Sequence, residues 1–232
     1  MGFIVEGIKQ AFLLLIHGDP QVLQIALLSL LVSGAATALS LVIGIPFGTL
    51  LGLSRFPGRR FLIGLTNTGM GLPPVVVGLV VSLFLWRYGP LGFFHLMYTP
   101  GAMIIAQFII SFPVVAGFTL AATQQLDPKL ALQIRALGAS RIQMVWFLLK
   151  EARLPLLAAV MAGFGAVISE VGASQMVGAN IQGQTRVLTT AVVSEVGKGD
   201  FSYAIALSVI LLVLVYVVNV ILTGIQQRSK PR

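Results

Sequence analysis

The sequence contains no cysteine and few charged side chains, and both shortages limit what the protein can be. Without cysteine, the chain forms neither a disulfide bond nor a thiolate metal site. Charged residues make up 9% of the 232 residues, whereas about a quarter is typical of soluble globular domains. Hydrophobic residues make up 57%, and the mean hydropathy is +0.97. This composition predicts an all-α, polytopic membrane protein.

The sequence also lacks the motifs of the common enzyme classes. It has no P-loop for ATP, no H-E-x-x-H zinc motif and no G-x-S-x-G nucleophile motif. The acidic residues at positions 19, 127 and 200 are explained as helix caps, and no two aspartates pair within a span. We therefore predict a protein that is not an enzyme and that binds no cofactor or metal itself.

Long apolar runs predict about five transmembrane helices, preceded by an amphipathic helix at 3–16 that lies on the membrane surface. A signal peptide is the alternative for that first segment. The spans are expected at about 21–53, 61–86, 101–123, 154–177 and 201–225, with a polar loop over 178–199. Prolines should break the second span near its middle and kink the third.

The basic residues predict the orientation of the chain. One set of loops holds eleven of the 15 lysines and arginines, and the other set holds four, at Lys9, Arg87, Arg186 and Lys198. The positive-inside rule assigns the richer side to the cytoplasm, so the N-terminus is expected outside and the C-terminus inside. The same rule explains the net charge of +8. The expected surroundings are therefore membrane lipid rather than nucleic acid.

One interval, residues 126–155, is both charged and helically periodic. Its first half has an Asp-Pro helix start and a glycine end, and its second half begins with a capping box. These three signals are Asp127 with Pro128, Gly138, and Ser140 with Gln143. They predict a short surface helix, a glycine turn and a second helix that runs towards Pro155. Such a protrusion from a membrane protein suits the docking of a soluble partner.

Within this interval, RALGASR followed by an apolar helix and Leu-Pro resembles the cytoplasmic EAA loop of ABC-importer permeases. In that family the loop forms a coupling helix that docks on the ATPase subunit. The Glu-Ala-Ala of the family pattern is replaced here by Leu132, Gln133 and Ile134, and Leu-Pro comes about one helical turn late. The resemblance extends over about residues 20–225. It is strongest to the molybdate/tungstate branch, through SEVGAS and GANIQGQTRVL between Ser169 and Leu188.

The resemblance implies a type I (MetI-like) permease fold in a bacterial or archaeal inner membrane, assembled as a homodimer. It also implies a cytoplasmic ABC ATPase dimer that holds ATP and Mg, an extracytoplasmic oxyanion-binding protein, and an oxyanion cargo, tungstate first. The residues that it assigns to ATPase coupling are Asp127, Leu130, Gln133, Ile134, Ala136, Leu137, Gly138, Ala139 and Arg141.

Residues that break or polarise the spans are the candidates for the translocation pathway or its gate. They are Pro73, Pro74, Pro113, Glu170, Ser174, Asn180 and Thr185. Glu170 is the one carboxylate expected inside a span. It is either a residue of the gate or a structural residue, which then forms a hydrogen-bonded tie between helices or lies near the membrane interface. The loop over 178–185 either offers neutral donors to an oxyanion or is a solvated turn. The prolines are either pathway elements or packing kinks.

We expect a single permease domain over residues 1–232, with 126–155 as its coupling loop. The alternative cargoes are molybdate, sulfate and other anions. A secondary transporter would need repeated halves and ion-pairing residues within spans, and the sequence has no convincing repeat. A membrane scaffold without transport would not need glycines and prolines within several spans. An ATP-driven importer is the preferred hypothesis.

Overall fold

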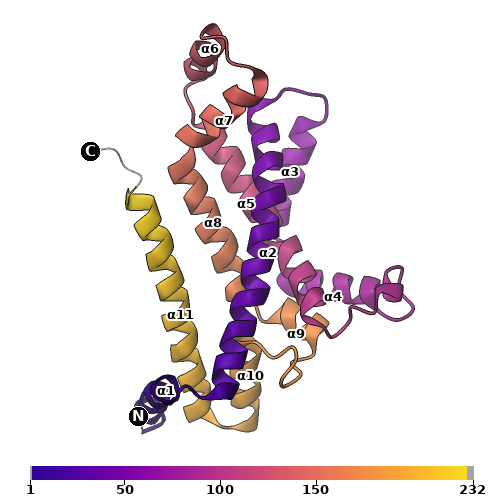
Figure 1. Cartoon of the computed structure of the whole chain (residues 1–232). Coiled ribbons are helices and arrows are strands. Elements are labelled where there is room, and N and C mark those ends of the chain that lie inside the picture. The colour runs from indigo at the N-terminus through magenta and orange to yellow at the C-terminus, as the bar shows by residue number, and fades with distance from the viewer. Residues whose placement is uncertain (1, 229–232) are drawn as a thin grey trace.

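The computed structural model describes the backbone of residues 2–228 and the side chains up to residue 224, and that part of the chain is almost entirely helical (Figure 1). The helices, in chain order, are α1 (Gly2–His17), α2 (Pro20–Leu53), α3 (Arg59–Met70), α4 (Pro74–Leu85), the short 3-10 helix η1 (Gly92–Phe94), α5 (Pro100–Gln124), α6 (Pro128–Ala136), α7 (Arg141–Glu151), α8 (Arg153–Ile168), α9 (Gly172–Gly178), α10 (Leu188–Lys198) and α11 (Phe201–Arg228). The predicted all-α fold is confirmed.

Close packing of α2 against α5 forms the centre of the bundle. Gly44, Gly48 and Gly52 recur every four residues on the face of α2 that meets α5. A Cβ atom at Gly48 would overlap the carbonyl oxygen of Ala116, and one at Gly52 would overlap the hydroxyl of Thr123. Small residues at this spacing let two helix backbones approach closely, which stabilises helix pairs in lipid where hydrophobic burial contributes little.

Two pairs of consecutive helices are sharply bent at a short break, and one of these pairs covers the expected second span. That span is divided into α3 and α4, which meet at 102° beside Pro73 and Pro74. The predicted break is confirmed, and it is a change of direction rather than a mild kink. Helices α7 and α8 meet at 72°. Three described helices, α2, α5 and α11, are long and apolar enough to cross a membrane alone, and the number rises to five if each bent pair forms one span.

Three boundaries differ from the sequence prediction. The expected span over 154–177 is not continuous, because α8 ends at Ile168 and α9 starts at Gly172. The predicted second helix of the charged interval stops at Glu151, and Pro155 lies within the first turn of α8. The expected polar loop over 178–199 contains α10. Leu188 and Ala191 of α10 are buried in a cluster with α2 and α11, and that burial stabilises a helix in a segment rich in polar residues.

The N-terminal helix α1 packs beside the first turns of α11. Gly7 contacts Ile205, and the rings of Phe3 and Phe201 are 6.3 Å apart. The opposite face of α1 is apolar and exposed, as expected for a helix at a membrane surface. Figure 1 places α1 and α10 at one end of the molecule and α6, α7 and the α2–α3 loop at the other. The basic loop over 54–60 and the basic interval over 126–153, which the sequence grouped together, therefore share one end, whereas Lys230 and Arg232 of the same group lie outside the described residues.

Candidate coupling surface and the loop cluster at the opposite end

Helices α6 and α7 form the predicted helix–turn–helix at the basic end. The side chain of Asp127 accepts a hydrogen bond of 2.9 Å from the amide of Lys129 and so caps α6. The capping box that begins α7 is complete, with bonds of 2.8 and 3.3 Å exchanged between Ser140 and Gln143. Gly138 joins the two helices with φ of +84°, a left-handed conformation that a side chain would strain.

Large apolar side chains are exposed on this protrusion. Leu137 is 88% exposed and Ile142 is 84% exposed, and Leu132 and Trp146 exceed 60%. No residue of α6 is buried. A soluble surface rarely leaves so many large apolar groups in one place without a partner. The protrusion therefore has the composition of a docking surface.

The coupling residues predicted from the sequence divide into two groups. Gln133, Ala136, Leu137, Gly138 and Arg141 are exposed, with Asp127 at the helix cap and Ala139 half-buried. Leu130 and Ile134 instead line a hollow of about 430 Å³ between α6, α7 and the start of α8. The exposed residues Leu132, Ile142 and Trp146 were not among the predicted coupling residues, although their apolar character on a polar segment was the available signal.

The predicted position of Glu170 inside a continuous span is wrong. Glu170 lies in the break between α8 and α9, where its Oε1 accepts a bond of 2.9 Å from the amide of Ala173. The carboxylate lies one residue before the N-cap position, which Val171 occupies, and it satisfies a first-turn amide of α9 that the break leaves open. It is not a side-chain tie between helices. Its backbone carbonyl, however, accepts a bond of 3.0 Å from the hydroxyl of Thr189 on α10.

The prolines and α9 lie on neighbouring elements. Helix α4, which begins at Pro74, packs on α9, with Gly78 against Ala173 and Gly172 against Val75. Pro113 is buried within α5, where Gly69 of α3 packs against its ring. The structure thus gathers the break at Pro73 and Pro74 and the break at Glu170 around α4 and α9, while Pro113 contacts the end of α3.

A polar pair that the sequence did not reveal connects α5 to α9. The side-chain amide of Gln107 donates a hydrogen bond of 3.1 Å to the hydroxyl of Ser174, and both residues are buried. Ser111 lies one turn further along α5 and is fully buried, and its hydroxyl has no partner. Of these residues only Ser174 was among the predicted gate residues. A lone glutamine in an apolar helix was the signal for Gln107.

The loop after α9 is held by its own hydrogen bonds. The hydroxyl of Thr185 donates to the carbonyl of Gly178 and accepts from the amide of Ile181. Thr185 is fully buried, and Asn180 adopts a left-handed φ of +54°. These features favour a defined turn over an open set of donors, although the buried Oδ1 of Asn180 lacks a partner.

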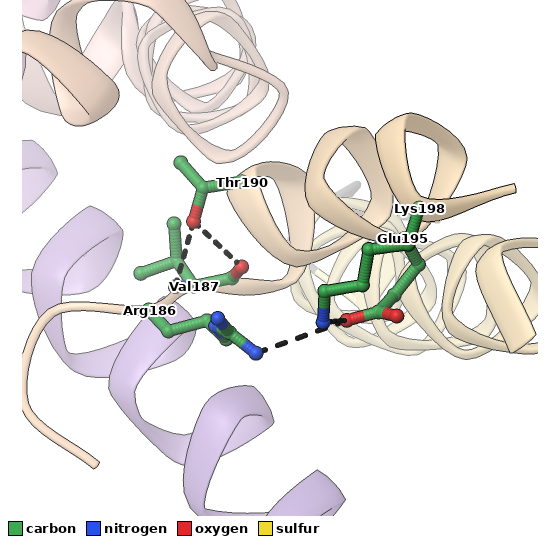
Figure 2. Close-up of polar contacts among 5 residues, drawn as sticks. All are labelled: Arg186, Val187, Thr190, Glu195 and Lys198. Atoms are coloured by element: carbon green, nitrogen blue, oxygen red, sulfur yellow. Dashed lines mark hydrogen bonds and ion pairs between the residues drawn. The ribbon is translucent and has the colours of Figure 1, made fainter. Parts of the chain in front are cut away.

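An ion cluster fixes this loop to α10 (Figure 2). The carboxylate of Glu195 lies 2.7 Å from Nζ of Lys198 and 3.8 Å from a terminal nitrogen of Arg186. Glu195 is buried, and Arg186 is 13% exposed. A buried carboxylate is stable only when it is paired, so Glu195 anchors the end of the loop. The sequence analysis did not single it out.

Comparison with solved structures supports the fold. The chain aligns with the inward-facing MetNI methionine ABC transporter at a TM-score of 0.76 and 21% identity, and the alignment covers 92% of this chain and 99% of that one. An amino acid ABC transporter crystallised with histidines aligns at 0.67 and 18% identity, covering 94% and 98%. The predicted MetI-like permease fold is confirmed.

Sequence comparison gives the family. The chain is 39% identical to the tungstate uptake system permease protein of Peptoclostridium acidaminophilum, over 98% of this chain and all of that protein. It is 34% identical to the tungstate uptake permease of Campylobacter jejuni, over 95% and 92%. The molybdenum transport permease of Escherichia coli is 32% identical over 75% and 79%. Residues 44–232 match the model of the binding-protein-dependent transport system inner membrane component, and the chain belongs to that family of multi-pass membrane proteins.

Proposed function

We propose that this chain is the permease subunit of an ATP-driven importer for tungstate. The apolar α6–α7 protrusion at the basic end of the helix bundle is the observation that supports assembly with an ATPase. The sequence has no P-loop, so hydrolysis of ATP belongs to a separate ATPase dimer that docks on this protrusion. The chain itself transports and does not catalyse a reaction.

Tungstate is preferred because of the relatives. Both tungstate permeases match over more than nine tenths of this chain, whereas the molybdenum permease matches over 75%. Tungstate and molybdate are both tetrahedral oxyanions of similar size. Their discrimination is expected to lie mostly in the extracytoplasmic binding protein rather than in the permease.

The proposed working unit is a homodimer with the pathway on its two-fold axis. One chain has few spans with which to enclose a pathway. Two identical copies related by a two-fold axis can enclose it between them. The N-terminus and α10 then face the outside, where the binding protein docks, and α6 faces the cytoplasm. This orientation follows the positive-inside rule.

The path of coupling in this proposal follows the chain from α6 to the outer loop. Motion of the ATPase shifts α6, which is joined to α7 by the Gly138 turn and the capping box. Helix α7 continues into α8, and α8 ends at the Glu170 break that orients α9. A movement of α8 therefore reaches α9 through this break, and with it the contacts that α9 makes with α4 and α5.

Uptake of tungsten, molybdenum and sulfur by cells with and without this chain tests the proposal. Cells are grown at limiting oxyanion concentrations, and the elements are measured by mass spectrometry. Selective loss of tungsten uptake is the expected result. Selective loss of molybdenum or sulfur uptake would show that the cargo is the oxyanion of that element and not tungstate. Unchanged uptake of all three elements would contradict an oxyanion importer.

A further inference from the structure

An arginine-rich loop lies at the same end of the molecule as α6, apart from the α6–α7 protrusion. The loop between α2 and α3 reads SRFPGRR, and its residues line a hollow of about 490 Å³. Three of the five lining residues are arginines, namely Arg55, Arg59 and Arg60, and the others are Phe56 and Gly58. A concave surface with three guanidinium groups and no acidic side chain attracts an anion.

The charges of this hollow are not neutralised within the described part of the chain. The ion pairs of Arg186 and Lys198 are both with Glu195 of α10, at the opposite end of the molecule, and no acidic side chain lines this hollow. Arg55 and Arg60 are exposed. Arg59 is half-buried, and its Nε donates a hydrogen bond of 2.6 Å to the carbonyl of Leu51 at the end of α2. The structure therefore holds one arginine in place and leaves two for a ligand.

The position of the loop relative to the membrane selects the kind of anion. Helix α2 has 34 residues, which gives a length of about 51 Å. The hydrocarbon core of a bilayer is about 30 Å thick and about 40–45 Å with the headgroups. The end of α2 therefore reaches the headgroup layer. Phe61 and Leu65, the next outward residues of α3, are 73% and 58% exposed, as is usual for side chains that contact acyl chains.

We propose that Arg55, Arg59 and Arg60 form a binding site for the phosphate group of an anionic phospholipid in the leaflet on the α6 side. The arginines contact the phosphate oxygens, and Phe61 lies against the upper part of the acyl chain. Figure 1 shows α6 projecting further from the bundle than the α2–α3 loop. The loop thus lies nearer the membrane than the surface expected to meet the ATPase. A bound lipid would fasten the end of α2 while α6 moves.

The experiment measures lipid bound to the full-length chain without the ATPase. Wild type, Arg55→Gln/Arg60→Gln and the control Arg87→Gln are reconstituted in phosphatidylcholine discs that contain a minority of phosphatidylglycerol. Bound phosphatidylglycerol is then counted by native mass spectrometry. Arg87→Gln removes one arginine charge from the other set of loops, the same change in charge as Arg60→Gln alone. Each arginine near a charged surface contributes about a fivefold change in affinity, so the double variant should bind phosphatidylglycerol about 25-fold more weakly, with the control unchanged.

Equal retention of phosphatidylglycerol by the double variant would overturn the site. The side chains of Arg55 and Arg60 are exposed, so the variant should fold. If it does not, Arg60→Gln alone carries the test with about a fivefold loss. Arginine modification by phenylglyoxal distinguishes the other sources. Protection by phosphatidylglycerol alone is expected. Protection by inorganic phosphate or tungstate in phosphatidylcholine discs would assign the arginines to a free anion. Protection only on adding the ATPase would assign them to the ATPase interface. Either result would contradict the proposal.

Discussion

The amide of Gln107 on α5 and the hydroxyl of Ser174 on α9 form a buried hydrogen bond of 3.1 Å between segments 67 residues apart in the sequence. Helix α9 has only seven residues and follows the break at Glu170, so its own backbone does little to hold it in place. This bond and the packing of Gly78 against Ala173 therefore fix α9 against the membrane-spanning bundle.

A double-mutant cycle over this pair should show coupling. We expect Ser174→Ala to destabilise the protein because it leaves the Gln107 amide buried without a partner. The combination with Gln107→Leu should recover part of that loss, with an interaction energy of about 0.6–1.7 kcal/mol. Thermal unfolding in detergent measures it. Ser208→Ala removes a hydroxyl that bonds only to the Ala204 carbonyl of its own helix and is the control. Strictly additive effects would contradict the role of the pair.

Substitution of Gly48 should weaken the bundle. The added Cβ of Gly48→Ala overlaps the Ala116 carbonyl, and forcing α2 away from α5 should cost about 1–3 kcal/mol. Gly34→Ala is a matched control on the same helix, because no atom lies within 4 Å of its Cβ. Unfolding midpoints in detergent should fall for Gly48→Ala and stay level or rise for Gly34→Ala. The reverse order would show that the glycine stripe does not set the packing.

The fold was largely predictable from the sequence, because apolar runs, helix caps and prolines act locally. Asp19, Asp127 and Asp200 each cap a helix as expected. What the sequence could not reveal depends on contacts between distant segments. Burial of Leu188 and Ala191 makes α10 helical, and the partner of Gln107 is fixed only when α9 folds back onto α5. The same holds for Glu170, whose neighbours in sequence suggest a span.

Gly138 allows a test of the coupling turn. Gly138→Trp strains a backbone with φ of +84° and adds bulk to the exposed protrusion, so ATPase stimulation and uptake should both fall at least tenfold. Gly199→Trp carries a comparable strain, at φ of +81°, at the other end of the molecule. ATPase binding measured on purified complexes should survive Gly199→Trp. Full coupling in the Gly138 variant would rule out this turn as the docking point.

The exposed apolar residues of the protrusion should contribute to ATPase affinity. A charge at Leu137, which is 88% exposed, would have to be desolvated on docking. We expect Leu137→Glu to weaken ATPase binding at least tenfold in a co-purification titration. Val196→Glu places the same charge on a 47% exposed position of α10 and should leave binding intact. Equal binding by both variants would place the docking surface elsewhere.

Glu195 should matter more to stability than its partner Lys198. Glu195→Gln leaves the guanidinium of Arg186, 13% exposed, without a counter-charge, and we expect a loss of about 1–2 kcal/mol. The side chain of Lys198 is 57% exposed, so Lys198→Gln should cost under about 1 kcal/mol. Thermal unfolding of both variants in detergent compares them. A larger loss for Lys198→Gln would contradict the anchoring role of the buried carboxylate.

Reconstituted transport tests the central claim most directly. The chain, its ATPase and its binding protein are placed in proteoliposomes, and tungstate that becomes trapped inside is measured with and without ATP. The account predicts ATP-dependent accumulation of tungstate that requires this chain and is lost in Gly138→Trp. Accumulation that is independent of ATP, or unchanged when this chain is omitted, would contradict it.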